Sequence, residues 1–89
     1  MDRDKVDNML CKYIMKEILS NSTYILEHNE GRIRCIDLLC NDETLDFPNI
    51  EECLIYWFDS IGEVEFKTIY GADSYNFAKY LKGKIFCLC

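Results

Sequence analysis

The sequence predicts an α+β fold, in which a mostly antiparallel sheet is packed by helices in the order α-β-β-α-β-α-β. Three observations support this fold class. Apolar residues recur at helical spacing near the amino end, a tight turn separates two segments rich in β-forming residues, and a capped amphipathic segment begins near the middle of the chain. With 89 residues and 49% apolar content, we expect residues 1–89 to form a single domain.

Residues 3–20 predict the first helix. Aspartates occupy its first turns, where the helix dipole favours negative charge, and Ser20-Asn21-Ser22 favours its end. One apolar stripe at helical spacing is expected to face the core, and it consists of Val6, Met9, Leu10, Tyr13, Ile14 and Ile18.

Residues 23–28 and 32–39 predict a β-hairpin. Both segments are rich in β-forming residues, and they flank the connection Asn29-Glu30-Gly31, in which glycine can adopt a left-handed conformation. In the second arm, the adjacent Cys35 and Ile36 predict either a bulge or a strand that is covered on both faces.

The segment from Cys40 to Pro48 predicts an acidic loop that leads into a helix over residues 50–61. Asn49 is a good N-cap, and Glu52 follows at the capping-box spacing, while Gly62 favours the end of the helix. The expected apolar face consists of Ile50, Cys53, Leu54, Trp57, Phe58 and Ile61.

The last third of the chain predicts strand, helix and strand. Residues 63–69 alternate, with Val64 and Phe66 on the expected inner face of a half-buried strand. Residues 71–74 predict a turn into a short helix over 75–82, which Gly83 closes. Residues 85–89 predict a final strand that is available as a sheet edge.

Negative charge is concentrated in one part of the chain. The 32 residues from Cys35 to Phe66 contain no Lys or Arg and nine of the 16 acids, so seven acids and all 10 bases lie elsewhere. The net charge is −6 and the isoelectric point is about 4.6. This asymmetry favours an electronegative face that attracts a cationic partner and repels nucleic acid and anionic lipid.

The six cysteines are expected to be free, buried thiols in a reducing compartment. No C-x2-C pair occurs, and His28 is the one histidine, although Cys35, Cys40, Cys87 and Cys89 leave a four-thiolate metal site conceivable. The longest apolar run has six residues, too few to cross a bilayer, and the amino end does not resemble a secretory signal. We therefore expect a cytoplasmic protein without cofactor, metal or membrane association.

Motifs for catalysis are absent from the sequence. Glu51 and Glu52 would diverge by about 100° on a helix and cannot share a substrate. A calcium loop that starts at Asp42 places Phe47 where glycine is required. A pair formed by His28 and a cysteine such as Cys35 is less favoured than an exposed hairpin histidine, and no phosphate-binding glycine motif occurs. We expect the protein not to be an enzyme.

The sequence predicts a small acidic protein-binding module that engages and inhibits a basic, nucleic-acid-handling protein, such as a nuclease, by mimicking nucleic acid. Phage anti-restriction and anti-CRISPR inhibitors share this composition, and ten Ile against two Ala and no Gln suit an AT-rich phage or mobile element. One alternative is a structural subunit or homo-oligomer, such as a homodimer, with no inhibitory role, and another is a small metal- or thiol-dependent protein that uses its cysteines. The partner-binding candidates are Asp42, Glu43, Asp46, Glu52, Tyr56, Asp59, Glu63 and Glu65.

Overall fold

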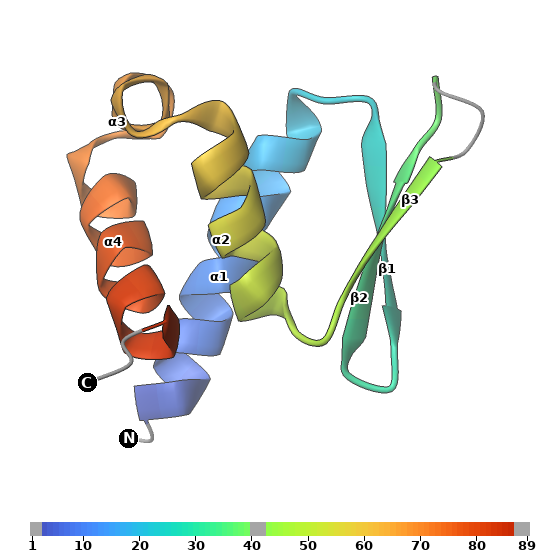
Figure 1. Ribbon diagram of the computed structural model, residues 1–89, viewed down its shortest axis with the longest axis horizontal. Helices are drawn as coiled ribbons and strands as arrows, with labels where there is room; N and C mark the ends of the chain where they lie inside the picture. Colours follow the sequence, from blue (N-terminus) through green and yellow to red (C-terminus); the bar gives the residue numbers. More distant parts are fainter. Residues whose placement is uncertain (1–2, 40–42, 87–89) are drawn as a thin grey trace. The chain divides into compact units, whose positions relative to one another are not determined.

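A computed structural model describes residues 3–39 and 43–86 (Figure 1). Within these ranges, four helices and a three-stranded antiparallel sheet confirm the α+β class. The elements are α1 (Arg3–Ser20), β1 (Tyr24–Asn29), β2 (Arg32–Asp37), β3 (Glu43–Phe47), α2 (Ile50–Ile61), α3 (Glu63–Tyr70) and α4 (Ala72–Phe86). Four of them, α1, β1, β2 and α2, lie where the sequence predicts them.

The chain divides into two compact units, Met1–Cys53 and Leu54–Cys89. Helix α2 begins in the first unit and ends in the second. The first unit contains α1 and the whole sheet, and the second contains α3 and α4. The expectation of a single domain over residues 1–89 stays a prediction.

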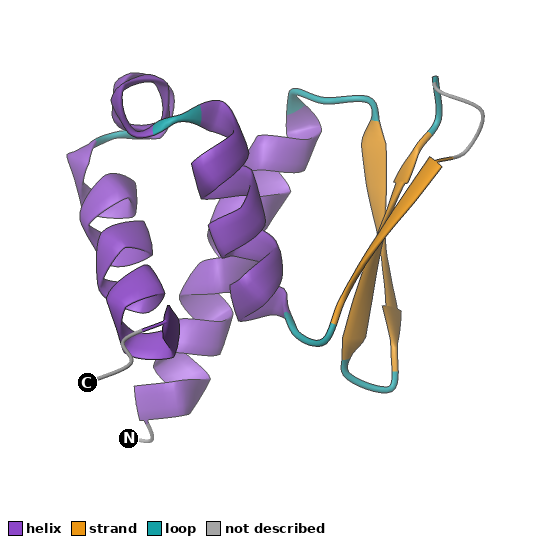
Figure 2. Ribbon diagram, viewed as in Figure 1, coloured by secondary structure: helices purple, strands orange, loops and turns teal. Residues whose placement is uncertain are grey.

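The sheet of the first unit consists of the three strands coloured orange in Figure 2, and their order is β1-β2-β3. Glu30 and Gly31 form the hairpin turn with φ angles of 52° and 84°, so both turn residues are left-handed, as tight hairpins require. The pairing runs without interruption from Asn29 opposite Arg32 to Tyr24 opposite Asp37. Of the two alternatives predicted at Cys35 and Ile36, the bulge is therefore absent, and the strand has Cys35 buried on one face and Ile36 half-buried on the other.

Helix α1 has the predicted bounds but a different buried face. Met9 is 69% exposed, and Leu10 and Tyr13 are exposed as well. Ile14 and Ile18 belong to both the predicted and the observed stripe, so the sequence did not distinguish two overlapping helical faces. The observed buried face consists of Asp7, Cys11, Ile14, Met15 and Ile18.

Strand β3 replaces most of the predicted acidic loop. It pairs antiparallel with β2, and Leu45 lies opposite the buried Cys35. Its carboxylates, Glu43 and Asp46, are exposed, and β3 lies at the edge of the sheet. The acidic residues therefore favoured the prediction of a loop, although the segment is a short strand in which Leu45 and Phe47, two positions apart, lie on the same face.

The predicted cap of α2 is confirmed, because the Glu52 amide donates a hydrogen bond of 2.9 Å to the Asn49 side chain. Four residues of its predicted apolar face are buried, whereas Trp57 and Ile61 are half-buried. Ile55 is also buried, which the sequence did not predict. The buried predicted residues are Ile50, Cys53, Leu54 and Phe58.

The strand predicted over 63–69 is wrong, because this segment forms α3. Gly62 and Gly71, with φ angles of 97° and 95°, separate α3 from α2 and α4. Phe66 is buried, but Val64 is 81% exposed, so the two residues do not share an inner face. Phe66 and Tyr70, one helical turn apart, have ring centroids 5.0 Å apart.

Helix α4 is longer than predicted. It begins directly after Gly71 and continues through Gly83, which does not close it. Ile85 and Phe86 are helical, so the predicted last strand is wrong at these positions, while 87–89 lie outside the described residues. Buried in α4 are Ala78 and Leu81.

Candidate functional site

Four of the partner-binding candidates lie in the second unit, and we call Tyr56, Asp59, Glu63 and Glu65 the second-unit acidic group. Tyr56 and Asp59 are three residues apart on α2, the spacing of neighbours on one helix face. Glu63 and Glu65 occupy the first turn of α3, where carboxylates suit the helix dipole. The Tyr56 side chain is 40% exposed, and its ring meets the Trp57 ring edge-on with centroids 5.7 Å apart.

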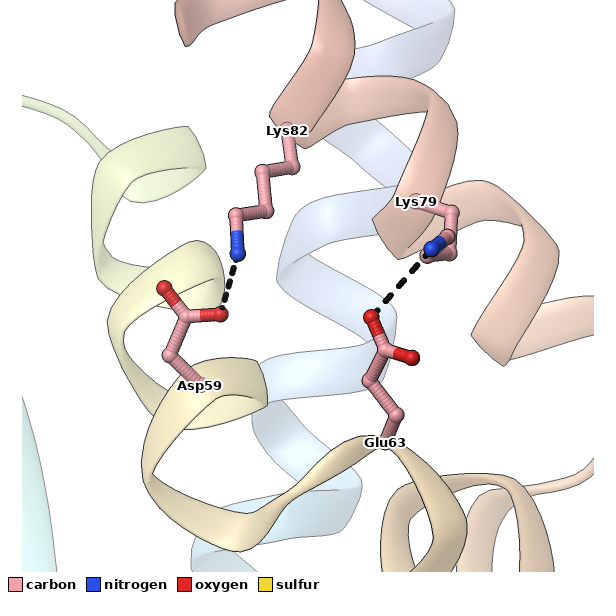
Figure 3. Close-up of polar contacts among 4 residues, drawn as sticks. All are labelled: Asp59, Glu63, Lys79 and Lys82. Atoms are coloured by element: carbon pink, nitrogen blue, oxygen red, sulfur yellow. Dashed lines mark hydrogen bonds and ion pairs between the residues drawn. The ribbon is translucent and has the colours of Figure 1, made fainter.

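Two members of this group form ion pairs with α4 (Figure 3). Lys82 Nζ donates to Asp59 Oδ1 at 2.8 Å, and Lys79 Nζ donates to Glu63 Oε1 at 3.2 Å. The hydrogen bond to Glu63, followed by its charge, raises the pKa of Lys79. The Asp59 and Glu63 side chains remain 50% and 51% exposed. Each carboxylate therefore forms an ion pair with a lysine and remains partly exposed to water.

Three of the described candidates lie in the first unit. Asp46 accepts a hydrogen bond of 2.9 Å from Arg34 Nε, which pairs β3 with β2 and raises the pKa of Arg34. Glu43 is exposed and lies opposite Asp37 in the sheet register. Glu52 is half-buried in the first turn of α2. Asp42 lies outside the described residues.

The candidates thus form two sets, one in each unit. The structure brings Asp59 and Glu63 together beside the α4 lysines, as Figure 3 shows. A continuous acidic surface across all the candidates stays a prediction. The cations that pair with the candidates were not predicted from the sequence, although Lys79 and Lys82 stand three residues apart, a spacing that indicates a shared helix face.

The cysteines include one close pair. Cys35 Sγ and Cys53 Sγ are 3.7 Å apart, and both residues are fully buried in the first unit. Leu26, rather than His28, lies opposite Cys35 in the sheet. Over 3–39 and 43–86, no group of three or more His, Cys, Asp or Glu side chains could hold a metal ion. Cys40, Cys87 and Cys89 lie outside the described residues, so the four-thiolate hypothesis is untested.

Among the helices that the structure describes, none combines the length and the apolar character needed to cross a membrane. Comparisons with protein families, with curated proteins and with solved structures gave no match.

Proposed function

We propose that this chain is a small acidic protein-binding module that engages and inhibits a basic, nucleic-acid-handling protein in the cytoplasm. The observation that carries the proposal is the distribution of charge. Nine carboxylates and no cation occupy residues 35–66 of a chain whose net charge is −6. A surface with this charge accelerates encounter with a cationic partner and disfavours nucleic acid as a direct ligand.

The ion pairs at Asp59 and Glu63 are compatible with partner binding. Exposed ion pairs of this kind contribute little to stability, so a partner's Arg or Lys can replace the intramolecular lysine at low cost. Lys79 and Lys82 would then keep the two carboxylates in position until the partner arrives. An acidic surface held in position before binding loses less entropy in the complex.

Tyr56 supplies the apolar part of the proposed contact. Its ring is 40% exposed and is held edge-on against Trp57. Tyrosine contributes a large contact area with few rotatable bonds and is enriched among residues that dominate binding energy. Carboxylates around such a ring select a basic partner and increase its association rate.

Inhibition would follow from competition. The DNA- or RNA-binding channel of a nuclease, polymerase or repressor presents Lys and Arg to phosphates, and carboxylates can occupy the same positions. A partner that is held in this way cannot contact its nucleic acid. The proposal therefore predicts mutually exclusive binding of this protein and nucleic acid.

The test is capture of the partner from nuclease-treated source lysate, followed by displacement of a labelled DNA duplex from that partner. The variant Glu52→Lys/Glu65→Lys changes two acids that form no ion pair within the described residues. We expect it to lose displacement at least tenfold. The matched control Glu27→Lys/Glu30→Lys has the same net charge but changes exposed acids outside residues 35–66.

Equal loss in both variants would show that net charge alone acts and would contradict a defined surface. Capture of only the protein itself would favour the homo-oligomer alternative. A captured partner that binds DNA and this protein at the same time would contradict inhibition by competition.

A further inference from the structure

A groove lined by basic rather than acidic side chains lies between α1 and β1 in the first unit. Its cavity volume is about 460 Å³, within the range of small-molecule sites. We call it the α1–β1 groove, and it is lined by Lys12, Lys16, Leu19, Ser20, Leu26 and His28. No carboxylate belongs to this lining, although the protein as a whole is acidic.

The cationic side of the groove comes from α1. Lys12 and Lys16 are one turn apart and both exposed, so their ammonium groups can reach the same ligand. His28 adds a second polar contact from β1, because side chains at alternate strand positions share a face with Leu26. Glu27 lies between them and therefore points to the other face, where its charge contributes to the raised pKa of Arg34.

Glu17, which follows Lys16 in the sequence, interacts with Tyr13. Glu17 accepts a hydrogen bond from Tyr13, and this bond, followed by the charge of Glu17, raises the pKa of the Tyr13 phenol. Tyr13 and Lys16 are three residues apart and are therefore neighbours on the helix surface, but neither Tyr13 nor Glu17 is among the residues that line the groove. Lys12 and Lys16 therefore line a groove that has no carboxylate among its lining residues.

The apolar part of the groove is short. Leu19 and Leu26 are both half-buried and offer partly exposed methyl groups to a ligand. A narrower hollow of about 120 Å³ continues past Lys12 and His28 toward Ile50. Two leucines beside two lysines suit a ligand with one anionic head group and one alkyl chain.

We propose that the α1–β1 groove binds an anionic amphiphile of the medium-chain carboxylate class. Its head group lies between Lys12 and Lys16, and its alkyl chain covers Leu19 and Leu26. Charge complementarity at the lysines fixes the orientation, and removal of the alkyl chain from water supplies most of the affinity. This inference is independent of the proposed inhibition, because it concerns different residues and a ligand of opposite charge.

The net charge of −6 allows binding in the groove to be distinguished from non-specific electrostatic binding. Non-specific electrostatics would favour a cationic amphiphile, whereas the groove favours an anionic one. The full-length protein is titrated with decanoate, decyltrimethylammonium and hexanoate below their micelle concentrations, and binding is followed by two-dimensional amide NMR. We expect saturable one-to-one binding of decanoate, with the largest shifts at residues 12–20 and 26–28.

Decanoate should bind at least tenfold more tightly than decyltrimethylammonium, because the two have alkyl chains of similar length but head groups of opposite charge. It should also bind at least tenfold more tightly than hexanoate, since four methylene groups are lost from a partly buried chain. The variant Lys12→Glu/Lys16→Glu should weaken decanoate binding at least tenfold. The control Arg32→Glu/Lys84→Glu, with the same net charge and no change in the groove, should retain it.

Binding of decyltrimethylammonium that equals or exceeds that of decanoate would overturn the proposal. So would decanoate shifts spread evenly over both units, or their retention in the Lys12→Glu/Lys16→Glu variant. An acidic peptide that binds the groove when decanoate does not would also overturn it, in favour of a protein ligand. The comparison of ligands uses the unaltered protein, so its outcome does not depend on the folding of any variant.

Discussion

Truncating Phe66 tests whether residues 63–70 form a helix in the way described. Phe66 is fully buried, and its ring centroid lies 4.9 Å from that of Phe58, at an interplanar angle of 87°. It also lies 5.0 Å from the Tyr70 ring. Phe66→Ala removes both aromatic contacts and leaves a cavity in the second unit, so we expect it to cost about 3–5 kcal/mol of unfolding free energy.

Val64→Ala is the matched control. A half-buried strand would place Val64 and Phe66 on one inner face, so both truncations would be destabilising. In the helix Val64 is 81% exposed, and its truncation should change stability by less than about 0.5 kcal/mol. The two variants therefore separate a helix from a strand without any structural measurement.

Urea denaturation followed by far-ultraviolet circular dichroism gives both free energies. A cost of about 3–5 kcal/mol is a large share of the roughly 5–13 kcal/mol expected for a domain of this size, so Phe66→Leu supplies a milder variant if Phe66→Ala does not fold. A double-mutant cycle with Phe58→Leu should give a coupling of about 0.5–1.5 kcal/mol. Equal destabilisation by Val64→Ala and Phe66→Ala would refute the helical assignment.

Three further predictions concern single contacts. Asn49→Ala should lower the unfolding free energy by about 1 kcal/mol in urea denaturation, because the Glu52 amide loses its cap, and Asn49→Asp should restore most of it. In an NMR titration of the lysine side chains, Lys79 of the unaltered protein should deprotonate at higher pH than Lys79 of the Glu63→Gln variant. Because the pKa is raised in the folded protein, the ion pair stabilises the fold at neutral pH, and this stabilisation is lost as pH rises through the raised pKa. Identical titration of Lys79 in the two proteins would contradict the ion pair. Cys35→Ser should cost about 1–3 kcal/mol in the same denaturation assay, because a hydroxyl requires a hydrogen-bond partner more strictly than a thiol, and Cys35→Ala should cost less than Cys35→Ser if desolvation of the hydroxyl dominates.

Local signals predicted the elements whose ends are fixed by nearby residues. The Asn49 cap and the left-handed Gly31 depend on neighbours within three residues, so the sequence contains the whole of each signal. The same is true of α1, whose first and last turns carry residues typical of helix ends. These are the parts of the fold that could be predicted.

The remaining elements depend on contacts that the sequence pattern does not specify. Residues 63–69 alternate in polarity, but Phe66 and Tyr70 are also spaced at one helical turn, and packing of Phe66 against Phe58 favours the helix. Strand β3 is stabilised by pairing with β2, which outweighs the low strand preference of its carboxylates.

The candidate acidic residues were chosen from the composition of the sequence, which did not predict the ion pairs that they form. The uneven distribution of charge marks residues 35–66 as the acidic part of the chain without any knowledge of the fold. The ion pair of Asp59 with Lys82 joins residues 23 positions apart, and the ion pair of Glu63 with Lys79 joins residues 16 apart. Such distant pairs depend on how α4 folds back, which no local pattern reveals.

The most direct test of the central claim is the salt dependence of affinity for the captured partner. Dissociation constants are measured from about 50 to 300 mM NaCl for the unaltered protein and for Glu52→Lys/Glu65→Lys, with circular dichroism as the check on folding. We predict that affinity of the unaltered protein falls steeply with salt and that the variant binds more weakly with a shallower dependence. Affinity that is insensitive to salt, or equal in the folded variant, would contradict recognition through the acidic residues.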